Sequence, residues 1–468
     1  MNKTELNKTK LNKADFSTLS LSKPMLDNLS ELGFTQMTPI QTQSLPPILE
    51  NRDVIAQAKT GSGKTVAFGI GTLNKLDVQK HGVQSLVLCP TRELADQVAV
   101  ELRRLARFTS NIKVLTLCGG VAFRPQAASL RHDAHIVVGT PGRILKHLRT
   151  GSLVLDALDT LVIDEAHRML DMGFIDEIDR VIDYTPHKRQ TLLFSATYPD
   201  EILALSGSIQ HDAVTIKTIE TESPNKIVEY FYNTSPSEKM DTLIKLLAHH
   251  QPDNAIVFSN TKIQARNIAT DLQTQGVDAQ AMHGDLEQYE RTDVLVQFAN
   301  RSCAVMVATD VAARGIDIKE LSMVINYDMP HDMATYTHRI GRTGRAGKEG
   351  IAVTFYSNRQ ASYIDEYRNE TRIFEHDMSA LSVPKKFRLK APNSTLVIEG
   401  GKKDKLRPGD ILGALTGDVS IEGKYVGKID IRDRQSYVAI DRSLTDKVHT
   451  WLKSGKIKGR KFSVWLLE

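Results

Sequence analysis

The sequence predicts an α/β protein of three domains, two built on parallel sheets and the last a small α+β domain. Short apolar runs alternate with helix-patterned segments through most of the chain, as in parallel sheets with helices on both faces. A glycine-rich loop joins one such run to a helix. The final segment instead combines shorter strand patterns with an excess of positive charge. A length of 468 residues exceeds what one hydrophobic core supports, so several domains are expected.

The first predicted domain covers residues 15–212, after a solvated tail at 1–14 that is rich in Asn, Lys and Thr. A strand over 54–56 precedes the glycine-rich loop. The further predicted strands are 85–89, 114–118, 136–139, 161–163 and 191–194, and the predicted helices include 93–108 and 176–182.

The second predicted domain, residues 227–378, repeats this architecture after a linker at 213–226. Its predicted strands are 255–259, 279–282, 305–309, 323–327 and 353–356, with helices over 262–275 and 287–299. This domain has no phosphate loop of its own. If it serves a nucleotide, it must therefore do so from across a cleft.

The third predicted domain covers residues 394–468, after a connector at 379–393. Strand patterns at 396–398, 427–431, 437–440 and 462–466 enclose helix patterns at 408–415 and 445–452. The order β-α-β-β-α-β predicts a split βαβ fold.

Composition narrows the class of protein. Hydrophobic content of 41% and charged content of 25% are typical of a soluble globular protein, and there is no apolar run long enough to span a membrane. Three dispersed cysteines without a CxxC spacing favour a reducing, cytoplasmic location over a disulfide or metal role. The net charge is +4, and residues 394–468 contribute 15 Lys and Arg against 10 Asp and Glu. That excess suits an appended nucleic-acid binder, although a charged surface is often only solvated.

The glycine-rich loop has the pattern of a phosphate cradle. In such a loop, backbone N–H groups and the start of the next helix surround the phosphates, a lysine adds a charge, and a hydroxyl ligates Mg²⁺. A structural turn is the bland alternative, but the flanking strand and helix favour the phosphate loop. The predicted loop residues are Ala58, Lys59, Thr60, Gly61, Ser62, Gly63, Lys64 and Thr65.

An acidic pair follows the predicted strand at 161–163. Asp164 and Glu165 therefore lie at a strand's carboxyl end, where open parallel sheets bind their ligands. Asp164 is expected to hold Mg²⁺ through water, and Glu165 to position and activate the attacking water. A helix-start acidic cluster is the alternative interpretation. With the loop, the pair predicts binding and hydrolysis of a nucleoside triphosphate.

Further motifs occur in a fixed order along the chain. They include 33–41, 90–94, 119–120, 140–143 and 195–197 in the first domain, and 283–285, Gln288 with Arg291, 308–310, 314–317 and 338–345 in the second. Together with the phosphate loop, this series resembles the DEAD-box RNA helicases over nearly the whole chain. The resemblance implies two RecA-like domains that close over ATP and RNA.

The resemblance implies an ATP site shared between the two domains. Phe16 would stack on adenine, and the Gln41 amide matches the N6 and N7 edge of that base. Each would otherwise be an ordinary core or surface residue. Asp317 would complete the ATP site, and Arg342 and Arg345 match the family's arginine fingers, although such a pair is commonly a solvated face.

The resemblance also implies RNA contacts and a relay between the two sites. Ser195, Thr197 and Arg339 would couple ATP to RNA, although Ser195 and Thr197 could be simple helix caps. The contacts to RNA phosphates and 2′-OH groups would position RNA without reading its sequence. They are Pro90, Thr91, Arg92, Gly119, Gly120, Thr140, Pro141, Gly142 and Arg143 in the first domain, and Gly284, Arg291 and Thr309 in the second.

One residue departs from the family pattern. The fourth position of the acidic box is Asp in the family and His167 here. The related DEAH helicases carry His at this point, but the other motifs side with the DEAD-box group. Because that Asp belongs to the relay, His167 bears on the coupling between hydrolysis and unwinding, and a histidine can titrate near neutrality.

The third domain resembles the appended RNA-recognition-motif-like domain of the DbpA subfamily. Its strands offer Tyr437 as the aromatic for base stacking, so basic residues would carry more of the RNA binding. The expected RNA-binding residues are Lys402, Lys403, Lys405, Arg407, Tyr437, Lys456, Lys458, Arg460 and Lys461. By resemblance, the target is a hairpin in large-subunit ribosomal RNA.

The expected function is an RNA-stimulated ATPase, with ATP and Mg²⁺, that separates short RNA duplexes during assembly of the large ribosomal subunit. The expected partners are ribosomal RNA and assembly intermediates, with no membrane and with DNA disfavoured. Two alternatives remain open: an ATP-gated RNA clamp or scaffold with little unwinding, which His167 makes conceivable, and a DNA helicase, which the RNA-specific motifs disfavour.

Overall fold

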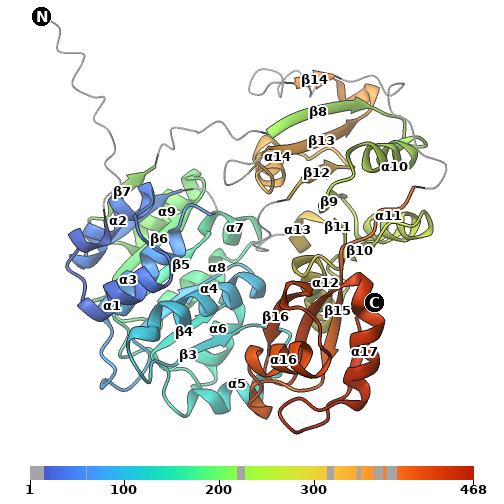
Figure 1. Cartoon of the computed structure of the whole chain (residues 1–468). Coiled ribbons are helices and arrows are strands. Elements are labelled where there is room, and N and C mark those ends of the chain that lie inside the picture. The colour runs from blue at the N-terminus through green and yellow to red at the C-terminus, as the bar shows by residue number, and fades with distance from the viewer. Residues whose placement is uncertain are drawn as a thin grey trace, which may run out of the picture. The chain divides into compact units, whose positions relative to one another are not determined.

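The structure is a computed structural model of the whole chain (Figure 1). It describes residues 15–58, 61–218, 227–313, 321–344, 349–361, 364, 373–375 and 387–467. The chain divides into two compact units, with the boundary between the first and second sheets. The first unit contains one sheet, and the second unit contains two.

The first unit is built on a seven-stranded sheet in the order β3-β4-β2-β5-β6-β1-β7. All of its strand pairs are parallel. The strands are β1 (Val54–Gln57), β2 (Ser85–Leu88), β3 (Val114–Leu117), β4 (Ile136–Gly139), β5 (Thr160–Asp164), β6 (Gln190–Ser195) and β7 (Val214–Lys217). Since every carboxyl end meets the same edge, the loops that follow these strands share one side of the sheet.

Helices cover both faces of this sheet and create two apolar cores, so alternate strand residues such as Leu192 and Leu193 enter opposite cores. The first core is closed by α1 (Lys23–Glu31), α2 (Pro39–Leu49), α3 (Lys64–Lys75) and α4 (Arg92–Leu105). The second is closed by α6 (Pro141–Arg149), α7 (Ala166–Asp171), α8 (Ile175–Ile182) and α9 (Asp200–Ile209). Helix α5 (Phe123–Leu130) follows β3.

The first sheet extends past the predicted domain end at residue 212. Strand β7 pairs with β1 from Val54 opposite Val214 to Gln57 opposite Lys217, so residues 214–217 belong to the sheet and not to the linker. The predicted end of the first domain stopped short of β7. This edge strand has one exposed face and therefore lacks the continuous apolar run by which the other strands were identified. The predicted strands inside the sheet agree with the structure to within about one residue at each end.

The second sheet is also seven-stranded and parallel, in the order β10-β11-β9-β12-β13-β8-β14. Its strands are β8 (Ile227–Asn233), β9 (Ala255–Phe258), β10 (Ala279–Met282), β11 (Val305–Ala308), β12 (Met323–Asn326), β13 (Gly350–Tyr356) and β14 (Ile373–Glu375). Its helices include α10 (Lys239–His250), α11 (Lys262–Thr274), α12 (Gln288–Ala299), α13 (Asp310–Ala313) and α14 (Met333–Ile340). Strand β8 was not predicted, although its β-branched and aromatic residues are typical of a strand.

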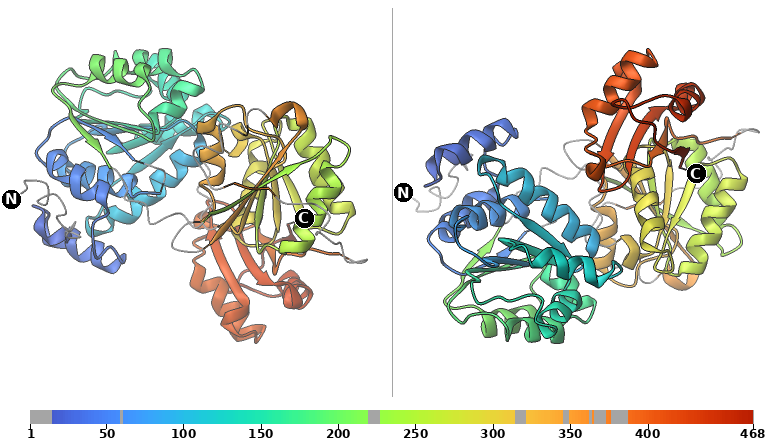
Figure 2. Two further views of the ribbon diagram at one scale, coloured as in Figure 1. Left: turned by 90° about the horizontal axis from the view of Figure 1, so that it is seen from above. Right: turned by 90° about the horizontal axis from the view of Figure 1, so that it is seen from below.

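The third sheet is antiparallel, with the order β16-β17-β15-β18. Its strands are β15 (Asn393–Ile398), β16 (Val426–Ile431), β17 (Ser436–Asp441) and β18 (Val464–Leu466), and its helices are α16 (Pro408–Gly413) and α17 (Thr445–Ser454). The helices pack on one face of the sheet, around Leu396 and Val438 (Figure 2). The predicted β-α-β-β-α-β order is confirmed.

The described residues contain no helix that is long and apolar enough to cross a membrane. Cys89, Cys118 and Cys303 are free and buried, as the sequence predicts for small apolar side chains.

Substitution of Phe194 tests how much the core beneath the phosphate loop contributes to stability. Its ring is fully buried and packs against Phe68 of α3, with 5.5 Å between ring centroids. We expect Phe194→Ala to lower the free energy of unfolding of the first domain by about 3–5 kcal/mol, because it opens a cavity between sheet and helix. Hydrogen exchange of the β1 and β6 amides measures this change. Val100→Ala, at a side chain that is 60% exposed, is the control; an equal loss there would contradict the assignment.

Candidate active site

The phosphate loop lies between β1 and α3, at the carboxyl edge of the sheet. Gly61 and Gly63 have φ angles of 87° and 98°, which side-chain-bearing residues rarely adopt. A Cβ on Gly63 would also lie 2.5 Å from Nε2 of Gln41. The sequence therefore needs glycine here for both conformation and space. Ser62 and Thr65 are partly exposed at the turn into the helix, and Lys59 and Thr60 lie outside the described residues.

Lys64 joins the loop to the acidic strand end. Its Nζ donates to Oε1 of Glu165 at 2.9 Å and to the carbonyl of Ala58 at 3.0 Å. Both charged side chains are almost fully buried, with 5% and 3% exposure. A buried ion pair of this kind is costly to break by removing one partner, so the two sequence motifs form one electrostatic unit.

Asp164 ends β5 with a carboxylate oxygen that has no partner. Its Oδ1 is buried and accepts no hydrogen bond from the described residues. Burial first, and then the negative charge of Glu165, raise the pKa of Asp164 to about 7. A divalent cation would satisfy this oxygen and supply the missing positive charge. Asp164 and the Thr65 hydroxyl are therefore a donor set that suits Mg²⁺.

Glu165 is held in an unusual backbone conformation and kept ionised. Its φ of 56° lies in the left-handed region, immediately before α7. Burial would raise the pKa of its carboxyl, but the charges of Lys64 and Arg168 outweigh burial and hold that pKa below its ordinary value. The two neighbouring carboxyls thus differ in character, since the pKa of Asp164 is raised and that of Glu165 is lowered.

His167 reaches the end of β6 from α7. Its Nδ1 lies 3.0 Å from Oγ of Ser195 and 3.3 Å from the backbone N of Ala196, while Nε2 lies 3.6 Å from Oε2 of Glu165. Ser195 in turn donates to the carbonyl of Thr197 at 2.6 Å. The histidine therefore bridges the acidic pair and the Ser195–Thr197 segment, which the sequence placed in one relay.

The expected adenine-binding residues are both buried. Phe16, 3% exposed, packs in the first core. Oε1 of Gln41 accepts from the backbone N of Thr38 at 2.8 Å, and Nε2 donates to the carbonyl of Gly63 at 3.2 Å. The Gln41 amide is therefore satisfied within the chain, and contact with a base requires some of these bonds to exchange.

The expected RNA-contacting loops of the first domain lie side by side. The residues Pro90–Arg92 follow β2, Gly119 and Gly120 follow β3, and Thr140–Arg143 follow β4, and these strands are neighbours in the order β3-β4-β2. The phosphate loop, the acidic pair and the Ser195–Thr197 segment lie at the ends of β1, β5 and β6, which are neighbours on the other half of the same edge. The sheet order thus separates the two groups that the sequence distinguished.

Two arginines are fixed in this group of loops. A Cβ on Gly120 would lie 1.8 Å from the Arg92 guanidinium, so the glycine allows that side chain to cross the loop. Arg143 donates to the carbonyl of Val121 at 3.0 Å and to Oε1 of Gln126 at 2.6 Å. Gln126 was not singled out from the sequence, because a helical glutamine carries no distinctive pattern. It orients Arg143 at the exposed edge.

In the second domain, Arg339 is buried and binds three other side chains. Its guanidinium binds both carboxylate oxygens of Asp310, at 2.7 and 2.6 Å, and donates to Oδ1 of Asn326 and of Asn260, each at 3.2 Å. These partners lie at or just after strand ends, which is the signal that could have identified them. Arg342 is buried, and Arg345 and Asp317 lie outside the described residues.

The remaining second-domain candidates follow two neighbouring strands, β10 and β11. Gly284 follows β10 and is exposed, Thr309 follows β11, and Arg291 lies in the first turn of α12. Strands β10 and β11 are neighbours, so these three candidates share one corner of the second sheet.

The basic residues of the third domain come together from two segments of the chain. Lys458 donates to the carbonyl of Lys405 at 3.1 Å, and Arg460 binds Asp404 at 3.1 Å. We name the exposed cations of these segments the basic cluster. They are Lys402, Lys403, Lys405, Arg407, Lys456, Lys458, Arg460 and Lys461.

Tyr437 does not fit the role expected of it. Its ring is 3% exposed and packs with Val397 against Val296 of α12, and its hydroxyl donates to Oδ1 of Asp293 at 3.1 Å. A base cannot stack on a ring that the second domain covers. The expectation treated the third domain as free, whereas its sheet face is packed within the second unit.

Comparisons with known proteins agree with this geometry. The DEAD/DEAH box helicase family matches residues 38–205, the Helicase conserved C-terminal domain matches 238–347, and the DbpA RNA binding domain matches 395–466. These matches show that the chain belongs to the DEAD-box family of ATP-dependent RNA helicases, in agreement with its phosphate loop, its acidic strand end and its second parallel-sheet domain.

The particular type follows from full-length similarity. The chain is 50% identical to the ATP-dependent RNA helicase DbpA of Escherichia coli (strain K12) over 454 residues, which cover 97% of this chain and 99% of that protein. It is 44% identical to ATP-dependent RNA helicase CshA of Listeria monocytogenes over 350 residues, 75% of this chain and 67% of that one. It is thus an ATP-dependent RNA helicase of the DbpA type, with an RNA-binding domain.

Solved structures support the fold of the two parallel-sheet domains. Dbp5 of S. cerevisiae bound to RNA and ADP BeF3 aligns with a TM-score of 0.70 and 31% identity, over 78% of this chain and 96% of that one. Mss116p bound to ssRNA and AMP-PNP aligns with a TM-score of 0.70 and 26% identity, over 79% of this chain and 81% of that one.

The raised pKa of Asp164 predicts a pH-dependent metal requirement. Protons compete with Mg²⁺ for its carboxylate, so apparent Mg²⁺ affinity should fall by up to about tenfold per pH unit below the pKa of about 7 and level off above it. The Mg²⁺ concentration for half-maximal RNA-stimulated ATPase, corrected for Mg²⁺ binding to ATP, measures this. Asp164→Asn should bind Mg²⁺ weakly at every pH. A constant requirement in the wild-type protein between about pH 6 and 8 would contradict the metal role.

Glu165→Gln separates binding from hydrolysis. Glutamine can still accept the hydrogen bond of Lys64 but cannot take a proton from water. We expect the turnover number to fall by about 10²–10⁴, with ATP and RNA affinity retained. Single-turnover hydrolysis and nucleotide binding distinguish these effects. Glu201→Gln, on the exposed first turn of α9, should have wild-type activity. Normal hydrolysis by Glu165→Gln would remove Glu165 from the mechanism.

Proposed function

We propose that Asp164, Thr65, Lys64 and Glu165 carry out ATP hydrolysis with distinct roles. Asp164 and Thr65 would hold Mg²⁺, which neutralises phosphate charge when it is bound. Lys64 would exchange its bond to Glu165 for the nucleotide phosphates. Glu165, freed from that charge, would orient the attacking water and accept its proton. The supporting observation is the buried 2.9 Å contact between Lys64 and Glu165.

The second domain completes the reaction in this proposal. Arg342 and Arg345 neutralise the transferring phosphoryl group, and Asp317 contributes to the nucleotide site, by resemblance to the family. Arg339 acts as a positioning residue, since its contacts are all within its own domain. Phe16 and Gln41 select adenine after the Gln41 amide exchanges its bond to Gly63.

The RNA would cross the exposed loops at the carboxyl edges of the first two sheets. The residues there offer backbone N–H groups and arginines, which suit phosphates and riboses better than base edges. Dbp5, to which both parallel-sheet domains are similar, was solved bound to RNA and ADP BeF3, which fits RNA binding by these two domains. His167, Ser195 and Thr197 then link RNA to Glu165 through the 3.0 Å contact between His167 and Ser195.

We infer that the third domain directs the helicase to large-subunit ribosomal RNA during ribosome assembly. The support is the resemblance to the DbpA subfamily, together with a basic cluster that two separate segments bring to one place. Crosslinking the full-length protein to RNA in cells and mapping the sites tests the target. Enrichment at one ribosomal helix is expected, whereas crosslinks scattered over unrelated RNA would refute it.

The alternative of an RNA clamp without unwinding receives no comparable support. It depended on His167 breaking the relay, and His167 keeps a contact with Ser195. Strand displacement on a short tailed RNA duplex, compared with an equivalent DNA duplex, discriminates the helicase from both alternatives. ATP turnover without displacement would favour the clamp.

The basic cluster predicts a salt-dependent preference. Lys402, Lys403 and Lys461 make no side-chain ion pair among the described residues, so we expect all three to face RNA phosphates. Affinity for RNA falls as the salt concentration rises. Replacing the three lysines with Gln should make the plot of log affinity against log salt less steep for ribosomal RNA, with the magnitude of the slope reduced by about 2–3. Affinity for unrelated RNA should change much less.

A matched variant removes the same charge elsewhere in the third domain. Lys424, Lys447 and Lys453 are exposed and lie outside the cluster, and changing them to Gln should leave the slope nearly unaltered. Equal effects of the two triple variants would show that net charge alone drives binding. In that case the basic cluster would not be what directs the enzyme to ribosomal RNA.

A further inference from the structure

The second and third domains share an interface within the second unit (Figure 2). The face of the third sheet opposite its own helices carries Thr395, Val397 and Tyr437, and these are at most 3% exposed. Val397 and Tyr437 pack against Val296 of α12. The apolar contact alone is small, so polar contacts around it decide how firmly the domain is held.

The strongest of these contacts converge on Asp278, which immediately precedes β10. Its Oδ1 accepts from Nζ of Lys390 at 2.7 Å, and its Oδ2 accepts from Nη2 of Arg442 at 2.5 Å and from the backbone N of Ala391 at 3.0 Å. Nε of Arg442 donates to the carbonyl of Ala391 at 2.8 Å. One carboxylate thus binds the connector and the third domain together.

A second group of contacts lies beyond the end of α12. Asn300 donates to Oγ1 of Thr395 at 3.1 Å, and Ser302 lies 2.7 Å from the same oxygen. Asn393 donates to the carbonyl of Asn300 at 2.9 Å. Polar contacts at Asp278 and beyond the end of α12 therefore add to the apolar contact in holding the third sheet against the second domain.

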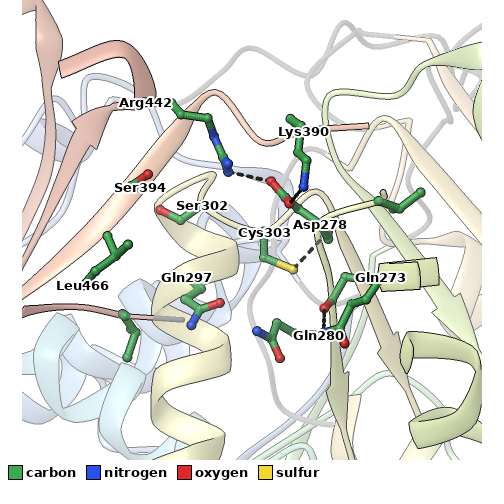
Figure 3. A pocket seen from close by; sticks show the side chains of 13 residues that line it. Gln273, Asp278, Gln280, Gln297, Ser302, Cys303, Lys390, Ser394, Arg442 and Leu466 are labelled. Carbon is green, nitrogen blue, oxygen red and sulfur yellow. Dashed lines mark hydrogen bonds and ion pairs between the residues drawn. The ribbon is translucent and has the colours of Figure 1, made fainter. Parts of the chain in front are cut away.

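The interface is polar and incompletely filled. A cavity of about 290 Å³ lies beside Asp278 and is lined by Gln273, Gln280, Gln297, Ser302 and Cys303 among others (Figure 3). The side chains of Asp278, Arg442 and Lys390 are 18%, 42% and 46% exposed. Partly exposed ion pairs of this kind are screened by salt, so the docking is reversible and sensitive to single changes.

Helix α12 carries residues of this interface and also an expected RNA contact. Arg291, an expected RNA contact, lies on its first turn, and Asp293 and Val296 on the same helix hold Tyr437 and Val397. An RNA segment bound to the basic cluster would therefore have a set position relative to the RNA path of the second domain. A freely tethered domain would raise only the local concentration of RNA.

We propose that Asp278 is a positioning residue of this helicase: through Arg442 and Lys390 it fixes the third domain on α12 and so determines which duplex near the anchored RNA is unwound. The docking stands on the contacts described above. Its effect on duplex choice rests on the proposed RNA-anchoring function of the basic cluster. The two parts are measured separately.

Docking is tested in the full-length protein by fluorescence energy transfer between Thr270→Cys on α11 and Lys447→Cys on α17. Both positions are exposed, and the native cysteines are buried and so should not label. We expect one narrow distance distribution that broadens at high salt. Asp278→Asn should raise the undocked fraction by roughly threefold, since it removes two partly exposed ion pairs. An unchanged distribution would overturn the proposal.

Two further variants guard against indirect effects. Tyr437→Phe removes the hydroxyl contacts with Asp293, at 3.1 Å, and with Gln435, at 3.4 Å, while it keeps the ring, and it should shift the distribution in the same direction. Asp241→Asn removes an ion pair with Lys245 within α10 and should have no effect. Equal broadening by Asp241→Asn would show general destabilisation of the second domain and would refute a specific role for Asp278.

Duplex choice is measured with RNAs that carry the large-subunit ribosomal segment crosslinked in cells and a short duplex at increasing single-stranded spacing. The wild-type protein should unwind one spacing best, whereas Asp278→Asn should unwind all spacings similarly, with unchanged RNA affinity and unchanged ATPase on poly(U). A sharp optimum in Asp278→Asn would overturn the positioning role. If no ribosomal segment is preferred at all, the proposed target fails, while the docking result remains interpretable.

Discussion

The structure depends on a topological constraint, which is that all strands of the first two sheets are parallel. Parallel strands place every carboxyl end at one edge, so residues scattered over the sequence meet there. The sheet order β3-β4-β2-β5-β6-β1-β7 then sorts these residues, with the expected RNA loops on one half and the nucleotide motifs on the other. The buried ion pair between Lys64 and Glu165 closes the nucleotide half and makes its two motifs act together.

The same edge explains how neighbouring carboxyls acquire different properties. Asp164 is buried beside the negative charge of Glu165 and has a raised pKa, whereas Glu165 adopts a left-handed backbone conformation, binds Lys64 and stays ionised. A single residue step at a strand end thus separates a carboxyl with a raised pKa from one that stays ionised, which we propose as the metal ligand and the water-orienting group. His167, which replaces the Asp of the family pattern, extends this arrangement to Ser195 through a 3.0 Å contact between its Nδ1 and the serine Oγ.

The third domain is joined to the enzyme by a different kind of interaction. Its sheet face packs on α12 through a few apolar residues surrounded by polar contacts, of which those of Asp278 are the strongest. The covered face leaves the basic cluster as the surface of this domain that suits RNA. The third domain and α12, which carries the expected RNA contact Arg291, therefore belong to one compact unit.

Much of the nucleotide site and of the fold class was determined by the sequence alone. Phosphate binding requires glycines followed by Lys64 and Thr65, and a buried parallel strand such as β5 requires a continuous apolar run before Asp164. Both requirements are local, so they are visible in the order of residues. The β-α-β-β-α-β order of the third domain is visible for the same reason. Edge strand β7 was missed because one of its faces is exposed.

Only the tertiary structure decided which side chains meet across long sequence distances. Periodicity shows that Tyr437 faces away from the helices of its own domain, but not that α12 covers it. Likewise the sequence gives no sign that Asp278 meets Arg442, or that the Gln41 amide binds Thr38 and Gly63. Such contacts depend on how whole elements pack, and a residue's own neighbours in the chain carry no information about the partner it finds there.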